Sequence, residues 1–210
     1  MYLSQLVLNE RQPQVYRDLV NAHKFHQRVM QAFPDEEERQ RPRADWHILY
    51  RHEPDSDVVL VQSAVEPEWS RLPEGYLQRY DTKRVHLTPD LVGGDRVFQF
   101  RLRANPSKRD PNTRKTIGFY HRADQLAWLE RQAKRCGFEL LGVDVIPSPN
   151  VFALKTNSRG PVRVVTALYQ GTLKVTDPAA FLRAVQQGIG RGKSYGCGLL
   201  SIARVRSGNR

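Results

Sequence analysis

The chain has 210 residues with 40% hydrophobic side chains, enough for one large packed domain or two small ones, so a disordered chain is excluded. Lysine and arginine outnumber aspartate and glutamate by 33 to 22, and the net charge of +11 favours a polyanionic partner, because each neutralised phosphate releases counterions. No apolar run approaches the ~20 residues of a membrane-spanning helix, and no basic amphipathic helix is long enough to lie on a bilayer, which argues against a membrane partner.

The first half of the chain predicts strands and one helix. Residues 2–8 alternate as a strand and lack the positive start and apolar core of a signal peptide, so we expect a cytoplasmic protein. Residues 22–33 have helical spacing, stop before Pro34 and follow Asn21, a plausible N-cap. A loop is expected at 34–44, strands at 46–52 and 58–65 and a turn at 54–57, whereas 66–90 are broken by prolines and Gly75.

Gly93-Gly94-Asp95 is the predicted boundary between an N-terminal module, residues 1–92, and a C-terminal module, residues 93–210. After it we expect a strand over 98–103, a helix over 122–136 ended by Gly137, strands over 138–146 and 151–155, a hairpin of 162–169 and 172–175 around Gln170-Gly171, a helix from Asp177-Pro178 to about 187, and a strand over 199–205.

The order of these elements approaches β-α-β-β-α-β in each half. This order predicts an α+β protein of two tandem ferredoxin-like modules with antiparallel sheets. The commonest module that recognises single-stranded RNA uses a four-stranded sheet of the same kind, so the modules are also RRM-like.

A glycine-rich loop, Gly188 to Gly198, resembles a nucleotide-binding P-loop but lacks its pattern. Gln187 stands where the P-loop requires its first glycine, and this loop leaves a helix and enters a strand. Closely spaced glycines let backbone N–H groups approach a phosphate, and the loop adds Arg191, Lys193 and Ser194. We therefore predict contact with phosphate or RNA backbone, with a tight structural turn as the alternative.

Two further basic clusters are candidate RNA-binding surfaces. Strand alternation places Arg101 and Arg103 on the face opposite the core, and they form one cluster with Lys108, Arg109, Arg114 and Lys115. The other cluster comprises Lys155, Arg159 and Arg163 in and beside a predicted hairpin loop. A solvated strand face or loop is the alternative in both cases.

His23 and His26 lie one helical turn apart. No metal is predicted for them, because no H-E-x-x-H or similar arrangement supplies further ligands, and Cys136 and Cys197 form no paired metal motif. Imidazole exchanges protons near neutrality, and a helix N-terminus attracts phosphate, so the pair suits RNA cleavage. The alternative for His26 is a structural histidine on an apolar stripe.

Four stretches resemble the CRISPR-associated repeat-RNA endonucleases of the CasE (Cse-type) group of the Cascade complex, subtype I-E. They are Met1-Tyr2-Leu3-Ser4; Asp18-Leu19 with His26 and Phe33-Pro34; Phe100 to Pro106 with Lys108; and Gly188 to Leu200. Ala127-Trp128-Leu129 also fits the family, and the likeness spans nearly the whole chain in order.

The resemblance implies an RNA stem-loop partner, other Cascade subunits and no small-molecule cofactor. It implies metal-independent cleavage at the 3′ base of the stem by the neighbouring 2′-hydroxyl, with His26 as general acid or base. Family members often have tyrosine where this chain has His23, which leaves His23 as an orienting group or a second proton carrier. The family's RNA-contacting loop matches Lys193, its basic strand matches Arg101, Arg103 and Lys108, and its stem-facing hairpin corresponds loosely to Lys155–Arg159. A non-catalytic RNA-binding scaffold subunit is the second hypothesis.

Overall fold

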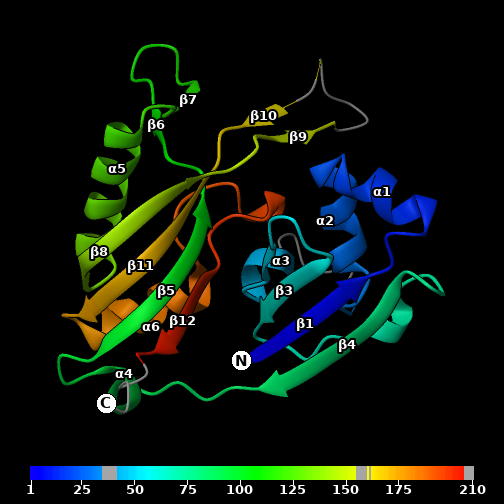
Figure 1. Ribbon diagram of the computed structural model, residues 1–210, viewed down its shortest axis with the longest axis horizontal. Helices are drawn as coiled ribbons and strands as arrows, with labels where there is room; N and C mark the ends of the chain where they lie inside the picture. Colours follow the sequence, from blue (N-terminus) through cyan, green and yellow to red (C-terminus); the bar gives the residue numbers. More distant parts are fainter. Residues whose placement is uncertain (35–41, 155–159, 161, 206–210) are drawn as a thin grey trace. The chain divides into compact units, whose positions relative to one another are not determined.

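The computed structural model describes residues 1–34, 42–154, 160 and 162–205 (Figure 1). Its contacts group the chain into two compact units, of which the first comprises Met1–His86, Asn150–Val164 and Gly192–Cys197, and the second comprises Leu87–Pro149, Val165–Arg191 and Gly198–Arg210. The first unit thus takes two segments from the second half of the chain. The module boundary predicted after residue 92 remains a prediction.

The first unit is built on a four-stranded antiparallel sheet with the order β2-β3-β1-β4. Its strands are β1 (Tyr2–Leu8), β2 (Leu49–His52), β3 (Val58–Ser63) and β4 (Leu77–Arg84). The first strand lies in the centre, with Leu6 opposite Val59 on one side and Tyr80 on the other. This strand order is that of a ferredoxin-like sheet.

Helices cover one face of this sheet. They are α1 (Pro13–Leu19), α2 (Ala22–Met30) and the short α3 (Pro42–Asp45), with a 3-10 turn η1 (Trp69–Arg71) where a second crossover helix would be expected. Phe25 and Val29 of α2 pack with Leu6 and Val59 of the sheet and with Trp69 in one buried cluster. The helix therefore presents an apolar face to the sheet and leaves its other side exposed.

The second unit repeats the topology with the sheet order β12-β5-β11-β8 (Figure 1). Its strands are β5 (Val97–Ala104), β8 (Phe138–Pro147), β11 (Ala167–Val175) and β12 (Leu200–Arg204), and its helices are α4 (Pro89–Val92), α5 (Arg122–Arg135) and α6 (Pro178–Gln187). The two longer helices pack on one face, because Trp128 of α5 stacks on Tyr169, whereas Phe181 of α6 stacks on Phe98 and also meets Phe138 edge-on. The predicted fold class, tandem ferredoxin-like modules, is confirmed.

Two small hairpins extend from this framework. The strands β6 (Ser107–Arg109) and β7 (Thr116–Gly118) form one, and β9 (Val151–Ala153) and β10 (Val162–Val164) form the other. The second hairpin belongs to the first unit, where β9 lies beside α2. Neither the β6–β7 hairpin nor helix α1 was predicted, since both carry few buried side chains.

The predicted hairpin around Gln170-Gly171 is wrong. Strand β11 runs straight through both residues, and Gly171 pairs with Phe100 of β5 and Val143 of β8. A side chain on Gly171 would collide with the backbone of Gly142, so the glycine allows a close approach of strands. The segment 162–164, expected to belong to the same hairpin, pairs instead with β9.

Candidate functional site

Helix α2 carries both candidate catalytic histidines in its first half. Asn21 adopts an extended backbone and accepts a hydrogen bond from the N–H of His23 at 3.2 Å, which confirms the predicted N-cap. His23 and His26 are both half-buried, whereas their neighbour Phe25 points into the core. The cap therefore fixes where the helix begins and where both imidazoles are presented.

His26 is supported by an aromatic side chain of strand β2. The rings of His26 and Tyr50 are stacked with centroids 6.2 Å apart and planes inclined by 14°. Phe25 meets the same tyrosine edge-on at 5.5 Å. Because Tyr50 is 2% exposed, it forms a rigid wall for the imidazole.

The same tyrosine holds the glycine-rich loop. Its hydroxyl donates a hydrogen bond to the carbonyl of Ser194 at 2.7 Å. Ser194 lies in a 3-10 turn, η2 (Lys193–Tyr195), which lies against α2. Lys193 and His26, separated by most of the sequence, therefore share one compact unit.

Close packing requires glycine at two positions of the loop. Gly196 has a φ of +77°, and a Cβ there would lie 3.3 Å from the ring of Tyr50. Gly190 has a φ of +79°, and a Cβ there would lie 2.9 Å from the ring of Trp128. The structural-turn interpretation therefore holds for these two glycines, while phosphate contact by Lys193 and Ser194 stays a prediction.

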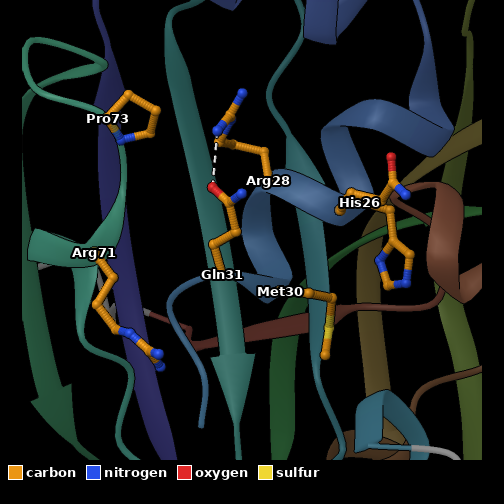
Figure 2. Close-up of a pocket in the computed structure, with 7 residues that line it drawn as sticks. His26, Arg28, Met30, Gln31, Arg71 and Pro73 are labelled. Carbon is orange, nitrogen blue, oxygen red and sulfur yellow. Dashed lines mark hydrogen bonds between the residues drawn. The ribbon is translucent and has the colours of Figure 1, made fainter. Parts of the chain in front are cut away.

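An open pocket of about 580 Å³ lies beside α2 and is lined by His26, Gln27, Arg28, Met30, Gln31, Arg71 and Pro73. Among the described residues that line it, the polar side chains are amides, an imidazole and two guanidinium groups. Figure 2 shows the imidazole of His26 pointing away from the hydrogen-bonded Arg28–Gln31 pair. This composition suits an anionic ligand.

A buried network fixes α2 against α1. Arg28 donates to Asp18 at 2.9 Å, the Tyr76 hydroxyl donates to the same carboxylate at 3.1 Å, and the guanidinium lies 5.1 Å from the Tyr76 ring centre. Burial raises the pKa of Tyr76, and the Asp18 carboxylate acts in the same direction. The phenol therefore remains a neutral donor, and the helix that carries His26 is held by three side chains.

In the second unit, Arg101 and Arg103 lie on the face of the sheet opposite its core, as predicted. Their neighbours Phe100 and Leu102 are buried, while the two arginines are partly exposed. Arg103 donates to the carbonyl of Pro149 at 3.1 Å. Ser201 and Gln170 flank Arg101 in register, so this part of the face is polar.

The β6–β7 hairpin presents further cations. Lys108 and Arg109 are exposed, and Arg109 donates to the carbonyl of Arg114. Arg191 of the glycine-rich loop donates to Thr116 of the hairpin at 3.0 Å. The pKa of Asp110 is lowered, chiefly because its carboxylate accepts hydrogen bonds from the backbone N–H and hydroxyl of Thr113.

The β9–β10 hairpin holds the third predicted cluster only in part, because Lys155 and Arg159 lie outside the described residues. Arg163 pairs across the strands with Phe152, and its guanidinium lies 5.9 Å from that ring centre. Phe152 is half-exposed. An aromatic ring and a cation therefore sit together on the described part of this hairpin.

Metal-ligating side chains are scattered over the described part of the chain. Across residues 1–34, 42–154, 160 and 162–205, no group of three or more His, Cys, Asp or Glu side chains is arranged to hold a metal ion. Among the helices that the structure describes, none is long and apolar enough to cross a membrane.

The structure brings together His23, His26, Lys193 and Ser194 in the first unit and places Arg101, Arg103, Lys108, Arg109 and Arg191 in the second. Sequence reasoning missed Tyr50, which contacts both His26 and the Ser194 segment. A buried strand aromatic is an ordinary core signal, so nothing in the sequence distinguished it. Asn21 was predicted as a cap alone.

Comparison with known proteins assigns the family. The family model described as "CRISPR associated protein" matches residues 1–204. The CRISPR-associated endoribonuclease Cse3 of Thermus thermophilus is 36% identical over 97% of this chain and 100% of its own length. The Cascade subunit CasE of Escherichia coli is 31% identical over 97% of this chain and 99% of its own length.

Solved structures agree with the sequence comparison. A structure of Cse3 bound to a 19-nucleotide RNA has a TM-score of 0.84 and 34% identity, covering 97% of this chain and 100% of that chain. The residues matched by the family model, 1–204, include all strands of both four-stranded sheets. With the family model matching almost every residue, the chain belongs to the CRISPR-associated protein family, in the group that includes Cse3 and CasE.

Proposed function

We propose that this protein is an endoribonuclease that binds the stem-loop of CRISPR repeat RNA and cleaves it at the 3′ base of the stem. The observation that carries the proposal is the placement of His26, half-buried against Tyr50, on a helix that lies against the Lys193-bearing turn. The relative Cse3, which is named an endoribonuclease, supports it at 36% identity. No cofactor is required by the chemistry proposed.

The reaction is an internal phosphoryl transfer. The 2′-oxygen next to the scissile phosphate loses its proton and attacks phosphorus, while the bond to the 5′-oxygen breaks and that oxygen takes up a proton. The products are a 2′,3′-cyclic phosphate and a 5′-hydroxyl. His26 supplies one of these proton transfers as general acid or base, which contributes about 10²–10⁴-fold; the remainder comes from in-line alignment of the 2′-oxygen.

RNA is held by the basic surfaces of both units. Lys193 and Ser194 lie in the turn against α2, while Arg101, Arg103, Lys108, Arg109 and Arg191 line the second unit. Lys155 and Arg159, which lie outside the described residues, belong to the same proposal. Phosphate contacts of this kind position the nucleic acid without reading its bases.

The partners follow from the family. CasE of Escherichia coli is named a subunit of Cascade, and we propose that this chain joins an equivalent assembly with other protein subunits. A cytoplasmic location belongs to the same proposal.

Incubation of the purified protein with repeat RNA tests the function directly. We expect cleavage at the 3′ base of the stem in buffer that contains EDTA, because the proposed reaction assigns proton transfer to His26 and uses no metal-bound water. Product ends are identified by treatment with phosphatase and polynucleotide kinase, and should be a 2′,3′-cyclic phosphate and a 5′-hydroxyl. Binding without cleavage would instead support the second hypothesis, a scaffold subunit. Cleavage that stops in EDTA and returns with a divalent metal would contradict the mechanism.

Tyr50→Phe tests the support of His26. The variant keeps the stacked ring but leaves the Ser194 carbonyl without its donor, a loss of about 1 kcal/mol that lowers Tm by about 2–4 °C. We expect cleavage to fall several-fold, since η2 is no longer tied to the wall behind His26. Tyr16→Phe, at a residue 68% exposed, is the matched control and should change neither quantity. An unchanged cleavage rate in Tyr50→Phe would exclude this role.

The dependence of the cleavage rate on pH distinguishes the two possible roles of His23. If His23 carries the second proton, His23→Ala should lose one limb of a bell-shaped dependence of rate on pH. If His23 only orients the nucleophile, the rate should fall without a change in the shape of the profile. His23→Tyr introduces the residue that family members often have, and should keep the wild-type shape of the pH profile only in the orienting case.

A further inference from the structure

A single side chain joins two segments of the first unit that are 133 residues apart. The Nδ2 of Asn21 donates to the carbonyl of Leu154 at 3.2 Å, and its Oδ1 accepts from the N–H of Leu154 at 3.1 Å. The same Oδ1 accepts from the N–H of His23 at 3.2 Å. The cap of α2 is therefore also a two-bond clamp on the end of β9.

The orientation of this amide is determined by its partners. Two N–H groups face the oxygen and one carbonyl faces the nitrogen, so exchanging the two atoms would leave every bond unmade. The main chain of Asn21 is occupied as well, since its N–H donates to Asp18 and its carbonyl accepts from Phe25. The backbone and side-chain polar groups of Asn21 thus all have hydrogen-bond partners.

The clamp adds to limited apolar packing. The side chains of Leu154 and Phe152 are 56% and 50% exposed, whereas the small side chain of Ala153 between them is fully buried. The Asn21 carboxamide therefore adds two hydrogen bonds to the β9–β10 ladder and the buried Ala153 at the end of β9. One end of the clamp therefore carries a hairpin with an exposed ring and Arg163, and the other end begins the helix with His23 and His26.

We propose that Asn21 is a positioning residue that holds the β9–β10 hairpin against the first turn of α2, so that RNA gripped by the hairpin is presented to His26. The proposal rests on the proposed function, because it assigns the clamp a role in that cleavage. A residue that served only as helix cap would need the bond to His23 and nothing from Leu154.

Asn21→Ser separates the two roles. Serine is as good an N-cap as asparagine, but its hydroxyl is too short to pair with both backbone groups of Leu154. Asn21→Ala removes cap and clamp together. Asn21→Asp keeps the two acceptor bonds and turns an oxygen, in place of the donor, toward the Leu154 carbonyl.

We expect Asn21→Ser to unfold within about 2–4 °C of the wild-type temperature, because the cap is kept and the two lost bonds to Leu154 are exposed to solvent. It should bind stem-loop RNA within about threefold of wild type. Its single-turnover cleavage rate at saturating protein should fall by about 10–100-fold, because misplacement of a bound substrate by about 1 Å costs that much. Hydrogen exchange of the Leu154 N–H, followed by NMR on the free protein, should accelerate. Asn21→Asp should show the same loss of cleavage with a retained cap.

Two results would overturn the proposal. One is Asn21→Ser cleaving at the wild-type rate while Leu154 exchanges faster, which would make the clamp irrelevant to catalysis. The other is unchanged exchange at Leu154, which would show that the clamp does not form in solution. If the wild-type protein itself cleaved no repeat RNA, the proposed function would fail with the catalytic role of Asn21, while the exchange measurement would still decide whether the clamp exists.

Discussion

His26→Ala is expected to reduce the single-turnover rate of repeat-RNA cleavage by about 10²–10⁴-fold, the contribution of one positioned proton carrier. Affinity for the stem-loop should stay within about twofold, because the phosphate contacts are assigned to lysine and arginine side chains on other elements. The rate is measured with protein in excess over labelled RNA, and the affinity with RNA that carries a 2′-deoxy group at the cleavage site.

His86→Ala is the matched control, since His86 is exposed and lies outside the candidate site. Its rate should equal that of wild type. The half-buried position of His26 makes a fold check necessary, so thermal unfolding of His26→Ala is compared with wild type. A folded His26→Ala protein that cleaves at the wild-type rate would make His26 structural and would remove the catalytic assignment.

Removal of Arg101 and Arg103 together is expected to weaken RNA binding by about 10²–10⁴-fold, since each charged hydrogen bond to phosphate contributes about 1.5–3 kcal/mol, or about 10–100-fold. The slope of log Kd against log salt should fall by about 1.5, at about 0.7–0.9 for each lost phosphate contact. Titrations at several salt concentrations measure both quantities. The cleavage rate of saturated complexes should change much less than the affinity.

The control for this pair removes the same charge from the other side of the same unit. Arg131 and Arg135 are exposed on α5, which covers the core face of the sheet. Their double alanine variant should keep most of the affinity and the full salt slope. Replacement of Arg101 and Arg103 by lysine keeps the charge and should recover the slope but not the whole affinity, because lysine cannot form a bidentate contact. An unchanged salt slope in the variant with alanine at both Arg101 and Arg103 would show that this sheet face does not contact phosphate.

Local chemistry allowed much of the fold to be predicted. The cap at Asn21, the Asp177-Pro178 helix start and the alternation through Phe98, Phe100 and Leu102 all act over a few residues, and all three predictions are confirmed. The predictions failed where pairing between distant strands decides the structure. Strand β4 is almost wholly exposed and has no apolar alternation, so its hydrogen bonds to β1 alone make it a strand.

Glycine was misinterpreted for a related reason. Gln170-Gly171 has the composition of a turn, but the absence of a side chain at Gly171 serves a close contact with β8 in mid-strand. Which of the two uses applies depends on neighbours more than twenty residues away. The residues next to Gly171 in sequence do not indicate which distant residues it will contact.

The candidate site, like the fold, was predicted from the sequence only in part. By itself the sequence determined the fold class, the basic character and the two histidines on a capped helix, because composition, periodicity and capping are properties of short segments. The family was predicted from the resemblance of its motifs. Only the tertiary structure decided that Tyr50 stacks on His26 and holds Ser194, and that Asn21 clamps Leu154. The two hydrogen-bonded contacts join residues over a hundred positions apart in sequence, and such contacts are fixed by the packing of whole sheets rather than by any local pattern.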